Sequence, residues 1–374
     1  MASITGKFIS ADGHVLEPGD LWVKRMDKRF RDRAPHIEPG EDGDSFYIED
    51  LPPLSFYDLI GGMANEKVAG RPIERRIHNK ESEMRPGALD PSARLLDQDL
   101  DNVKAEIVYP NLGLFFYLTK DPEYRRECIR VYNEWLAEYC AVAPKRLLGV
   151  AMLPLGGPQE WLVQEVERSA KMGLCSVMLP TGYPRIPYND AYYRRAFEVL
   201  QEIGMPLAIH NGGNEEIFTM PAYEQTGSPV GIIESKLICQ ERALCHLLCC
   251  GVLQTLPRLK VVMAEAGIGW VAAMLRLIDH WWEDHHRWAE PRLDQPPSFY
   301  CKRQVWFTFE DDRPGLLTGE CLNVDHLMWG SDYPHTEGTF PVSRQRIEKD
   351  FADLPADITR KLVIDNAARL YGID

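Results

Sequence analysis

The stretch FISADGHVLEP (residues 8–18) decides the fold, because its apolar run ends in a carboxylate and an imidazole two positions apart. If the run is a β-strand, Asp12 and His14 point to the same side, since side chains alternate between the two faces of a strand. An acid and a histidine at the C-terminal end of a strand form half of a metal site. The other half has to come from other strands of the fold.

Two later stretches can supply it. PLAIHNGG (206–213) is a short apolar run that ends in His210, and HLMWGSDYPH (326–335) is another that ends in Asp332. A (β/α)8 barrel gathers side chains from the C-terminal ends of several strands at one face. Histidine and carboxylate together are typical metal ligands. The predicted metal ligands are therefore Asp12, His14, His210 and Asp332.

Strand and helix patterns alternate along the rest of the chain. Short apolar runs, typical of buried parallel strands, are separated by segments with apolar residues at helical spacing. One helix is expected to begin after Asp121, which suits an N-cap, with Pro122 next to it. The remaining strands are expected at 105–113, 147–155, 175–182, 259–267 and 305–310. The pattern predicts an α/β fold, a (β/α)8 TIM barrel, with residues 1–374 as a single domain.

A long insertion is expected after the first strand. Residues 20–91 are rich in glycine, proline and charge and lack the strand and helix alternation that follows. Insertions between a strand and its helix lie at the catalytic face of a barrel, so this segment is a candidate lid. A loop that contacts another subunit is the alternative. A second irregular stretch is expected at 214–230.

Composition disfavours several classes of partner. The formal charge of −14 argues against nucleic acid or an anionic membrane surface, because either needs a basic patch. The chain has no run of about 18 apolar residues that would span a membrane, and its amino terminus lacks the apolar core of a signal peptide. We expect a cytoplasmic protein with a small-molecule substrate that forms a homo-oligomer, a dimer. The nine cysteines fit reduced thiols better than a disulfide framework.

One glycine pattern points elsewhere. The segment GIGWVA (267–272) satisfies the dinucleotide-binding pattern GxGxxG/A between a predicted strand and a predicted helix. Five strands precede it, whereas this fingerprint normally opens its unit, and no acidic residue ends a following strand about 20 positions later. A tight turn explains Gly267 and Gly269 more simply. A nicotinamide or flavin enzyme is therefore disfavoured.

The predicted ligands carry a family resemblance. The DxH motif at residues 12–14, His210 after the fifth strand and GSDYPH at 330–335 resemble the amidohydrolase superfamily. The similarity is to its amidohydrolase-related branch (family 2), with metal-dependent hydrolases and decarboxylases of the aminocarboxymuconate-semialdehyde and resorcylate types. The resemblance spans Asp12 to Asp332. It implies a TIM barrel that binds a divalent transition metal, zinc, iron or manganese, as one or two ions.

The sixth strand departs from that resemblance. The decarboxylases of the branch typically carry a histidine there, whereas MAEAG places Glu265 at this position. Glu265 can bind or bridge metal ions and take part in catalysis, in a carboxylate-rich site that suits iron or manganese as well as zinc. Alternatively, it accepts a hydrogen bond from the other ring nitrogen of His14 or His210. We favour the first, because a carboxylate in a partly desolvated mouth is costly without a compensating cation.

Four further residues are candidates for the surroundings of the metal. Glu17 is expected to hold the ligands or the lid in place rather than to bind the ion. His335 can reach the mouth to bind substrate or a second ion, or else it fixes the turn at the adjacent proline. Trp22 and Trp270 are candidate walls of the pocket, although aromatic residues of this kind are more often part of a core.

The first functional hypothesis is a metal-dependent hydrolase. The metal would activate a water that attacks an amide, lactone, ester or thioester, and Asp332 would move the proton. Two ions about 3.5 to 4 Å apart, bridged at Glu265, would favour this reaction. The alternative is non-oxidative decarboxylation of an aromatic or unsaturated acid at one ion. A third hypothesis is a barrel with a decayed metal site that only binds a partner or a small molecule, against which the retention of all four ligands speaks.

Overall fold

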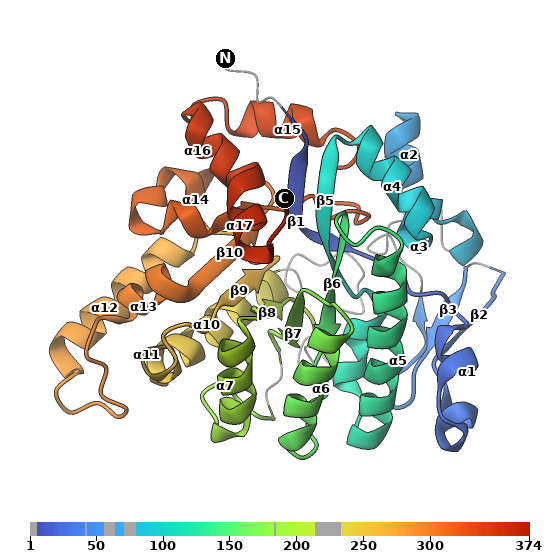
Figure 1. Ribbon diagram of the computed structural model, residues 1–374, viewed down its shortest axis with the longest axis horizontal. Coiled ribbons are helices and arrows are strands. Elements are labelled where there is room, and N and C mark those ends of the chain that lie inside the picture. The colour runs from blue at the N-terminus through green and yellow to red at the C-terminus, as the bar shows by residue number, and fades with distance from the viewer. Residues whose placement is uncertain (1–5, 42, 56–63, 71–79, 183–184, 214–232) are drawn as a thin grey trace.

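The computed structural model describes residues 6–374 except 42, 56–63, 71–79, 183–184 and 214–232. Eight parallel strands form one sheet, in which each strand pairs with the next along the chain. They are β1 (Phe8–His14), β5 (Val103–Tyr109), β6 (Leu147–Met152), β7 (Ser176–Pro180), β8 (Leu207–His210), β9 (Val261–Ala264), β10 (Val305–Phe309) and β11 (Leu327–Trp329). The predicted (β/α)8 barrel is confirmed, and helices surround it (Figure 1). The irregular stretch expected at 214–230 lies outside the described residues.

Helices connect the strands and cover the outside of the barrel (Figure 1). The α-helices that follow the insertion are α4 (Pro91–Leu100), α5 (Pro122–Ala141), α6 (Glu160–Lys171), α7 (Arg194–Ile203), α10 (Cys239–Cys249), α11 (Val252–Thr255), α12 (Val271–His285), α13 (Pro297–Gln304), α14 (Arg313–Leu317), α15 (Ser343–Asp350), α16 (Ala356–Arg360) and α17 (Asn366–Tyr371). Two π-helical turns, η6 (Glu234–Ile238) and η9 (Lys361–Asp365), continue into α10 and α17. The 3-10 turns are η1 (Lys28–Arg33), η3 (Glu81–Glu83), η4 (Leu112–Leu118), η5 (Ala191–Tyr193), η7 (Gly319–Cys321) and η8 (Val324–His326).

The start of α5 shows how local sequence sets an element. The Asp121 carboxylate accepts hydrogen bonds from the backbone N–H groups of Glu123 and Tyr124, at 3.0 and 3.3 Å. Pro122 occupies the first helical position, where a missing N–H costs nothing. The predicted N-cap is confirmed. The helix that begins here packs its buried side against β6.

The barrel closes between β1 and the segment that follows β11. An isolated parallel bridge joins Gly13 to Tyr333. The Asp332 N–H donates to the Asp12 carbonyl at 3.0 Å, and the His14 N–H donates to the Tyr333 carbonyl at 2.6 Å. The two backbones approach so closely that a Cβ atom on Gly330 would lie 2.5 Å from the Asp12 Cβ. Closure therefore requires a glycine at position 330 and places two predicted ligands side by side.

A buried arginine stabilises this closure of the barrel. Arg94, on α4, pairs with Glu106 of β5 through two contacts of 2.8 Å, and both side chains are almost completely buried. Its guanidinium also donates to the His14 carbonyl at 2.7 Å and lies 4.2 Å from the centre of the Tyr333 ring. One side chain thus links the first two strands to the segment after the last strand.

The described parts of the insertion lie against segments that follow the C-terminal ends of strands. They comprise α1 (Leu21–Arg25), an antiparallel sheet of β2 (His36–Glu38), β3 (Ser45–Tyr47) and β4 (Leu54–Ser55), α2 (Ala64–Ala69) and α3 (Pro86–Leu89). The Trp22 ring contacts Phe116, in the turn after β5. Lys67 of α2 donates to the Gly338 carbonyl, beyond β11, at 2.6 Å. The role of a lid stays a prediction.

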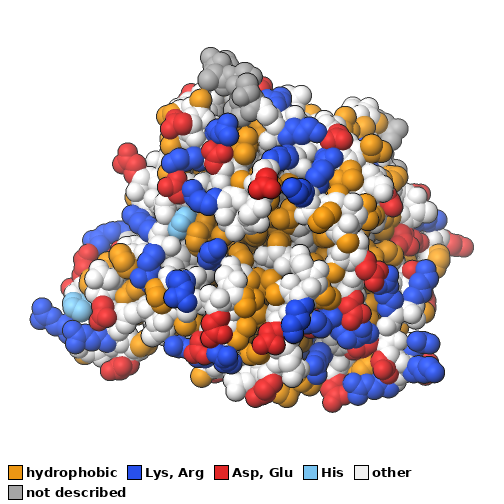
Figure 2. Space-filling view, in the orientation of Figure 1, with side chains coloured by type: hydrophobic (Ala, Val, Ile, Leu, Met, Phe, Trp, Pro, Cys, Tyr) orange, Lys and Arg blue, Asp and Glu red, His pale blue; other side chains and the backbone are white. Residues whose placement is uncertain are grey.

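The surface mixes both signs of charge. Figure 2 shows Lys and Arg side chains interspersed with Asp and Glu on the face in view, with hydrophobic side chains between them. Among the described residues, we find no helix with the length and apolar character needed to cross a membrane. The predicted dimer is not tested by these observations and stays a prediction.

Replacing Arg94 with methionine tests the importance of the buried pair. The variant would leave the Glu106 carboxylate buried without its charge partner, so we expect the free energy of unfolding to fall by about 3–5 kcal/mol. Urea unfolding in the presence of a chelator measures this loss without a contribution from bound metal. The double variant Arg94→Met/Glu106→Gln removes both charges and should recover much of the loss. A single variant as stable as the parent protein would contradict this account of barrel closure.

Candidate metal centre

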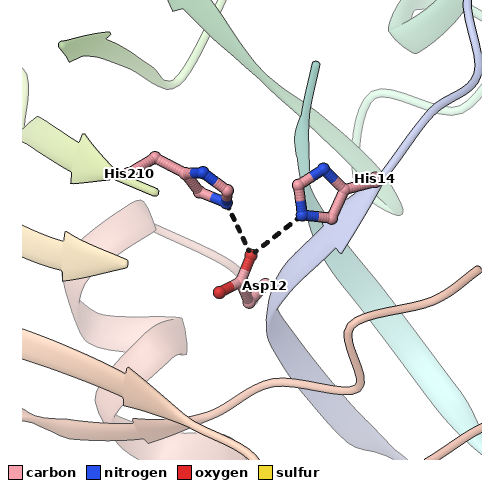
Figure 3. Close-up of side chains that lie close together, drawn as sticks. All are labelled: Asp12, His14 and His210. Carbon is pink, nitrogen blue, oxygen red and sulfur yellow. Dashed lines mark ion pairs between the residues drawn. The ribbon is translucent and has the colours of Figure 1, made fainter. Parts of the chain in front are cut away.

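Asp12 lies at the mouth of the barrel. One of its carboxylate oxygens accepts hydrogen bonds, and the other has no hydrogen-bond partner among the described residues. Its Oδ2 accepts hydrogen bonds from the backbone N–H of Glu265 at 2.8 Å and from the Thr308 hydroxyl at 2.9 Å. These contacts, from the ends of β9 and β10, fix the orientation of the carboxylate. Oδ1 then points toward His14 Nε2 and His210 Nε2, at 3.9 and 3.6 Å (Figure 3).

Both histidines present the same nitrogen to this centre. The Nδ1 atom of His14 bonds to the Pro110 carbonyl, and that of His210 bonds to the Asn211 carbonyl, each at 2.8 Å. Because a carbonyl only accepts hydrogen bonds, Nδ1 carries a proton in both rings, and Nε2 is the nitrogen available to a cation. Burial lowers the pKa of His210, but Asp12 and Glu265 outweigh this and raise it. Burial and the imidazoles of His335 and His210 lower the pKa of His14 well below its usual value, so its ring stays neutral.

Asp332 completes the set from the segment after β11. Its side chain is buried, and its Oδ1 lies 3.4 Å from His14 Nε2 and 2.9 Å from His335 Nδ1. Burial, followed by the negative charge of Glu265, raises the pKa of Asp332 well above its usual value. The His335 ring stacks on His14 with the ring centres 4.1 Å apart. The structure therefore brings the four predicted ligands together, with His335 beside them.

The donor set fits a divalent metal. Among the described residues, Asp12 Oδ1, His14 Nε2, His210 Nε2 and Asp332 Oδ2 are buried and have no hydrogen-bond partner, while Asp332 Oδ1 has the ion-pair contact with His335. Buried polar atoms are nearly always paired, so a cluster of unpaired lone pairs requires a cation. Ligand atoms of Asp12, His14 and His210 lie within 4.8 Å of one another. Nitrogen and oxygen ligands of this kind suit a transition metal such as manganese, iron or zinc.

Glu265 is held differently from these ligands. It follows β9 in the left-handed backbone region, with φ of 52°, and its Oε1 lies 2.7 Å from Lys236 Nζ. Its Oε2 lies 3.8 Å from His210 Nε2. Since the Nδ1 atoms of His14 and His210 both bond to backbone carbonyls, Glu265 orients neither ring through that nitrogen. The cation that compensates its charge is an ammonium group of the chain itself.

Lys236 is a residue beside the predicted ligands that the sequence did not reveal. Burial lowers its pKa, but the surrounding carboxylates, Glu265 first, outweigh this and raise it well above the usual value. In turn, although burial favours the neutral acid, Lys236, His210 and His335 hold the pKa of Glu265 at about 2. In the sequence, the signal was a single lysine within the largely apolar residues 232–239. The structure places this lysine on the π-helical turn η6. Such turns are frequent at functional sites.

Glu17 lies near the centre in a supporting position. The Glu17 carboxylate accepts hydrogen bonds from three consecutive backbone N–H groups, at positions 111–113, at 2.8–3.1 Å. It thereby fixes the turn that begins at Pro110, whose carbonyl orients His14. Burial raises the pKa of Glu17 to about 7, against the effect of these hydrogen bonds.

The two tryptophans do not meet the predicted ligands in any contact that we observe. Trp22 is fully buried between Phe46 and Phe116, with its Nε1 donating to the Cys128 carbonyl at 3.0 Å. It joins the insertion to the barrel, so its proposed place in a pocket wall is corrected to the core. Trp270 is half-buried, and its Nε1 donates to the Ala266 carbonyl at 2.8 Å.

The glycine pattern at 267–272 is a turn closed by a carboxylate. Asp312 accepts hydrogen bonds from the N–H groups of Ile268 and Gly269, at 2.5 and 2.7 Å. Gly267 has a φ of 64°, which favours glycine. The Asp312 carboxylate thus already accepts the hydrogen bonds of the backbone N–H groups that a pyrophosphate would need. All nine cysteines are free, as expected for reduced thiols.

Curated relatives of the chain are decarboxylases. It is 24% identical over 294 residues to 2-amino-3-carboxymuconate-6-semialdehyde decarboxylase of Dictyostelium discoideum, covering 76% of this chain and 77% of the relative. It is 28% identical over 280 residues to gamma-resorcylate decarboxylase of Rhodococcus jostii, covering 68% and 79%. The predicted hydrolase is therefore wrong as the main interpretation, and a carboxy-lyase fits. A second metal ion at Glu265 was expected to favour hydrolysis, and Lys236 already compensates the charge of Glu265.

Solved structures share the fold over the whole chain. An amidohydrolase of Mycobacterium avium subsp. paratuberculosis superposes with a TM-score of 0.81 at 19% identity, covering 98% of this chain and 100% of that one. A mutant 5-carboxyvanillate decarboxylase of Novosphingobium aromaticivorans gives 0.70 at 17% identity, covering 100% and 99%; that structure holds manganese and 3-methoxy-4-hydroxy-5-nitrobenzoic acid.

The family itself follows from the sequence. The family model described as Amidohydrolase matches residues 91–373, from the first helix after the insertion to the end of the last one. The match includes His210 and Asp332, while Asp12 and His14 precede it. The resemblance that we inferred from the ligand motifs is confirmed: this chain belongs to the amidohydrolase family.

Proposed function

We propose that this protein catalyses the non-oxidative decarboxylation of an aromatic or unsaturated carboxylic acid at a centre with one divalent metal ion. The observation that carries the proposal is a cluster of buried ligand atoms from β1, β8 and the segment after β11. Ligand atoms of Asp12, His14 and His210 lie within 4.8 Å of one another, and Asp332 Oδ1 lies 3.4 Å from His14 Nε2. The decarboxylase names of the curated relatives support this reaction over others that a metal-binding barrel can perform.

Four side chains would hold the ion: Asp12, His14, His210 and Asp332. Manganese is the metal we favour, because a structural neighbour carries it and because the set contains two carboxylates. When bound, the ion supplies a positive charge that anchors the substrate's carboxylate and stabilises negative charge developing on the substrate. Thr308 and the backbone of Glu265 keep Asp12 oriented, and Pro110 and Asn211 do the same for the two imidazoles.

The reaction needs one proton and no oxidant. The bond between the carboxyl carbon and the ring or alkene carbon breaks, carbon dioxide leaves, and a proton takes its place. Glu265 is a poor donor, because Lys236 keeps it ionised. His335 Nδ1 lies 2.9 Å from Oδ1 of the ligand Asp332, and the His335 side chain is 12% exposed. We assign the proton that reaches carbon to this pair.

Removing one imidazole should empty the centre. Purified without added metal and then reconstituted with Mn²⁺, the parent protein should hold about one ion per chain, whereas His210→Ala should bind it at least about tenfold more weakly. Mass spectrometry of the metal content, with a Mn²⁺ titration, measures both. His280→Ala, which changes an exposed histidine on α12, is the matched control and should bind like the parent. Equal occupancy in all three proteins would remove His210 from the ligand set.

Decarboxylation has a direct isotopic test. The manganese-loaded protein is incubated in D₂O with gamma-resorcylate, 5-carboxyvanillate and 2-amino-3-carboxymuconate-6-semialdehyde, the compounds in the relatives' names. We expect carbon dioxide from at least one acid and a single deuterium at the carbon that lost it, because solvent supplies the proton. Asp332→Asn should abolish turnover, while Asp311→Asn, at an exposed position, should preserve it. Absence of carbon dioxide from all such acids would refute the proposed reaction.

A further inference from the structure

A second group of acids lies beside the proposed metal ligands. Glu265, Asp332 and Glu337 each offer one carboxylate oxygen, and these oxygens lie within 4.8 Å of one another. Asp332 therefore belongs both to this group and to the proposed ligand set. Carboxylates so close together repel unless a cation lies among them. A second divalent ion that shares Asp332 with the first would be one solution, as in two-metal hydrolytic sites.

The structure has a different cation at this place. Lys236 Nζ lies 2.7 Å from Glu265 Oε1 and 3.1 Å from Glu337 Oε1, so it pairs with two of the three acids at once. Its side chain is 30% exposed, which leaves the ammonium at the edge of the mouth. These are hydrogen-bonding distances, and an ion bound to the same oxygens would have to occupy the same space.

The position of Lys236 is fixed by its helix. Lys236 is part of η6, which continues into α10. Gln240, one turn later and fully buried, donates through Nε2 to the Ala264 carbonyl at 2.8 Å. Ala264 is the last residue of β9 and the neighbour of Glu265. The segments that carry the lysine and its main partner are therefore joined by the Gln240 hydrogen bond as well as by the ion pair.

We propose that Lys236 keeps the metal centre mononuclear, because its ammonium group takes the place of a second divalent ion among Glu265, Asp332 and Glu337. This inference rests on the metal ligands of the proposed function but not on the reaction. A fixed single charge replaces a metal that could exchange or carry a bridging hydroxide. The mouth thus keeps one ion to anchor an anionic substrate, with a lysine beside it.

Metal stoichiometry tests this directly. Parent protein, Lys236→Met and Lys236→Arg are titrated with Mn²⁺ by calorimetry and their tightly bound metal is counted. We expect about one ion per chain in the parent and in Lys236→Arg, which keeps the charge, and about two in Lys236→Met, which exposes the three acids. Electron paramagnetic resonance of Lys236→Met should show two coupled Mn²⁺ ions. The double variant Lys236→Met/Glu337→Gln should return to about one ion.

Each outcome bears on the inference. Two tight ions in the parent protein would overturn it without any variant, and a single ion in Lys236→Met would overturn it while leaving the proposed centre intact. No ion in the parent would refute the metal centre itself. Circular dichroism checks that each variant is folded, and Lys236→Gln, which keeps a polar side chain, replaces Lys236→Met with the same expectation if that variant does not fold.

Discussion

The backbone hydrogen bond from Asp332 to the Asp12 carbonyl, 3.0 Å long, is the contact on which the centre depends. It belongs to the closure of the barrel, and Gly330 permits it because any side chain there would collide with Asp12. Two carboxylates from opposite ends of the chain are thereby forced together in a buried space. Burial of two carboxylates so arranged is costly unless positive charge lies nearby, so the geometry of closure favours a bound cation. Arg94 stabilises the same closure, because its guanidinium pairs with Glu106 and donates to the His14 carbonyl.

The two groups of acidic and histidine side chains at the mouth differ in whether the chain itself supplies a cation for them. On one side Asp12 Oδ1, His14 Nε2, His210 Nε2 and Asp332 Oδ2 have no hydrogen-bond partner among the described residues. On the other side Glu265 and Glu337 have their cation in Lys236. The resemblance led us to expect a histidine where Glu265 stands, yet the chain's curated relatives are decarboxylases. Lys236 pairs with Glu265, and this pair adds little net charge at that position.

The sequence could predict the barrel and the ligand set for a physical reason. Buried parallel strands are continuous apolar runs, and polar residues at their ends stand out; Asp12, His210 and Asp332 are all of this kind. Lys236 could not be found in this way, because it comes from a helix and its partners are distant in sequence. Trp22 and Glu17 show the same limit: their neighbours, Phe46 and the amides at 111–113, become neighbours only when the insertion packs on the barrel. The hydrolase hypothesis is wrong because the curated relatives are decarboxylases, and the sequence showed the charge of Glu265 without showing its counterion, Lys236.

The central claim is that one divalent ion lies among Asp12, His14, His210 and Asp332 while Lys236 serves as the second cation. Diffraction from crystals grown with Mn²⁺, recorded on both sides of the manganese absorption edge, tests it most directly. The account predicts a single anomalous peak in contact with Asp12 Oδ1, His14 Nε2, His210 Nε2 and Asp332, with Lys236 Nζ still between Glu265 and Glu337. Two peaks about 3.5 to 4 Å apart, or a peak that none of these four side chains contacts, would contradict it.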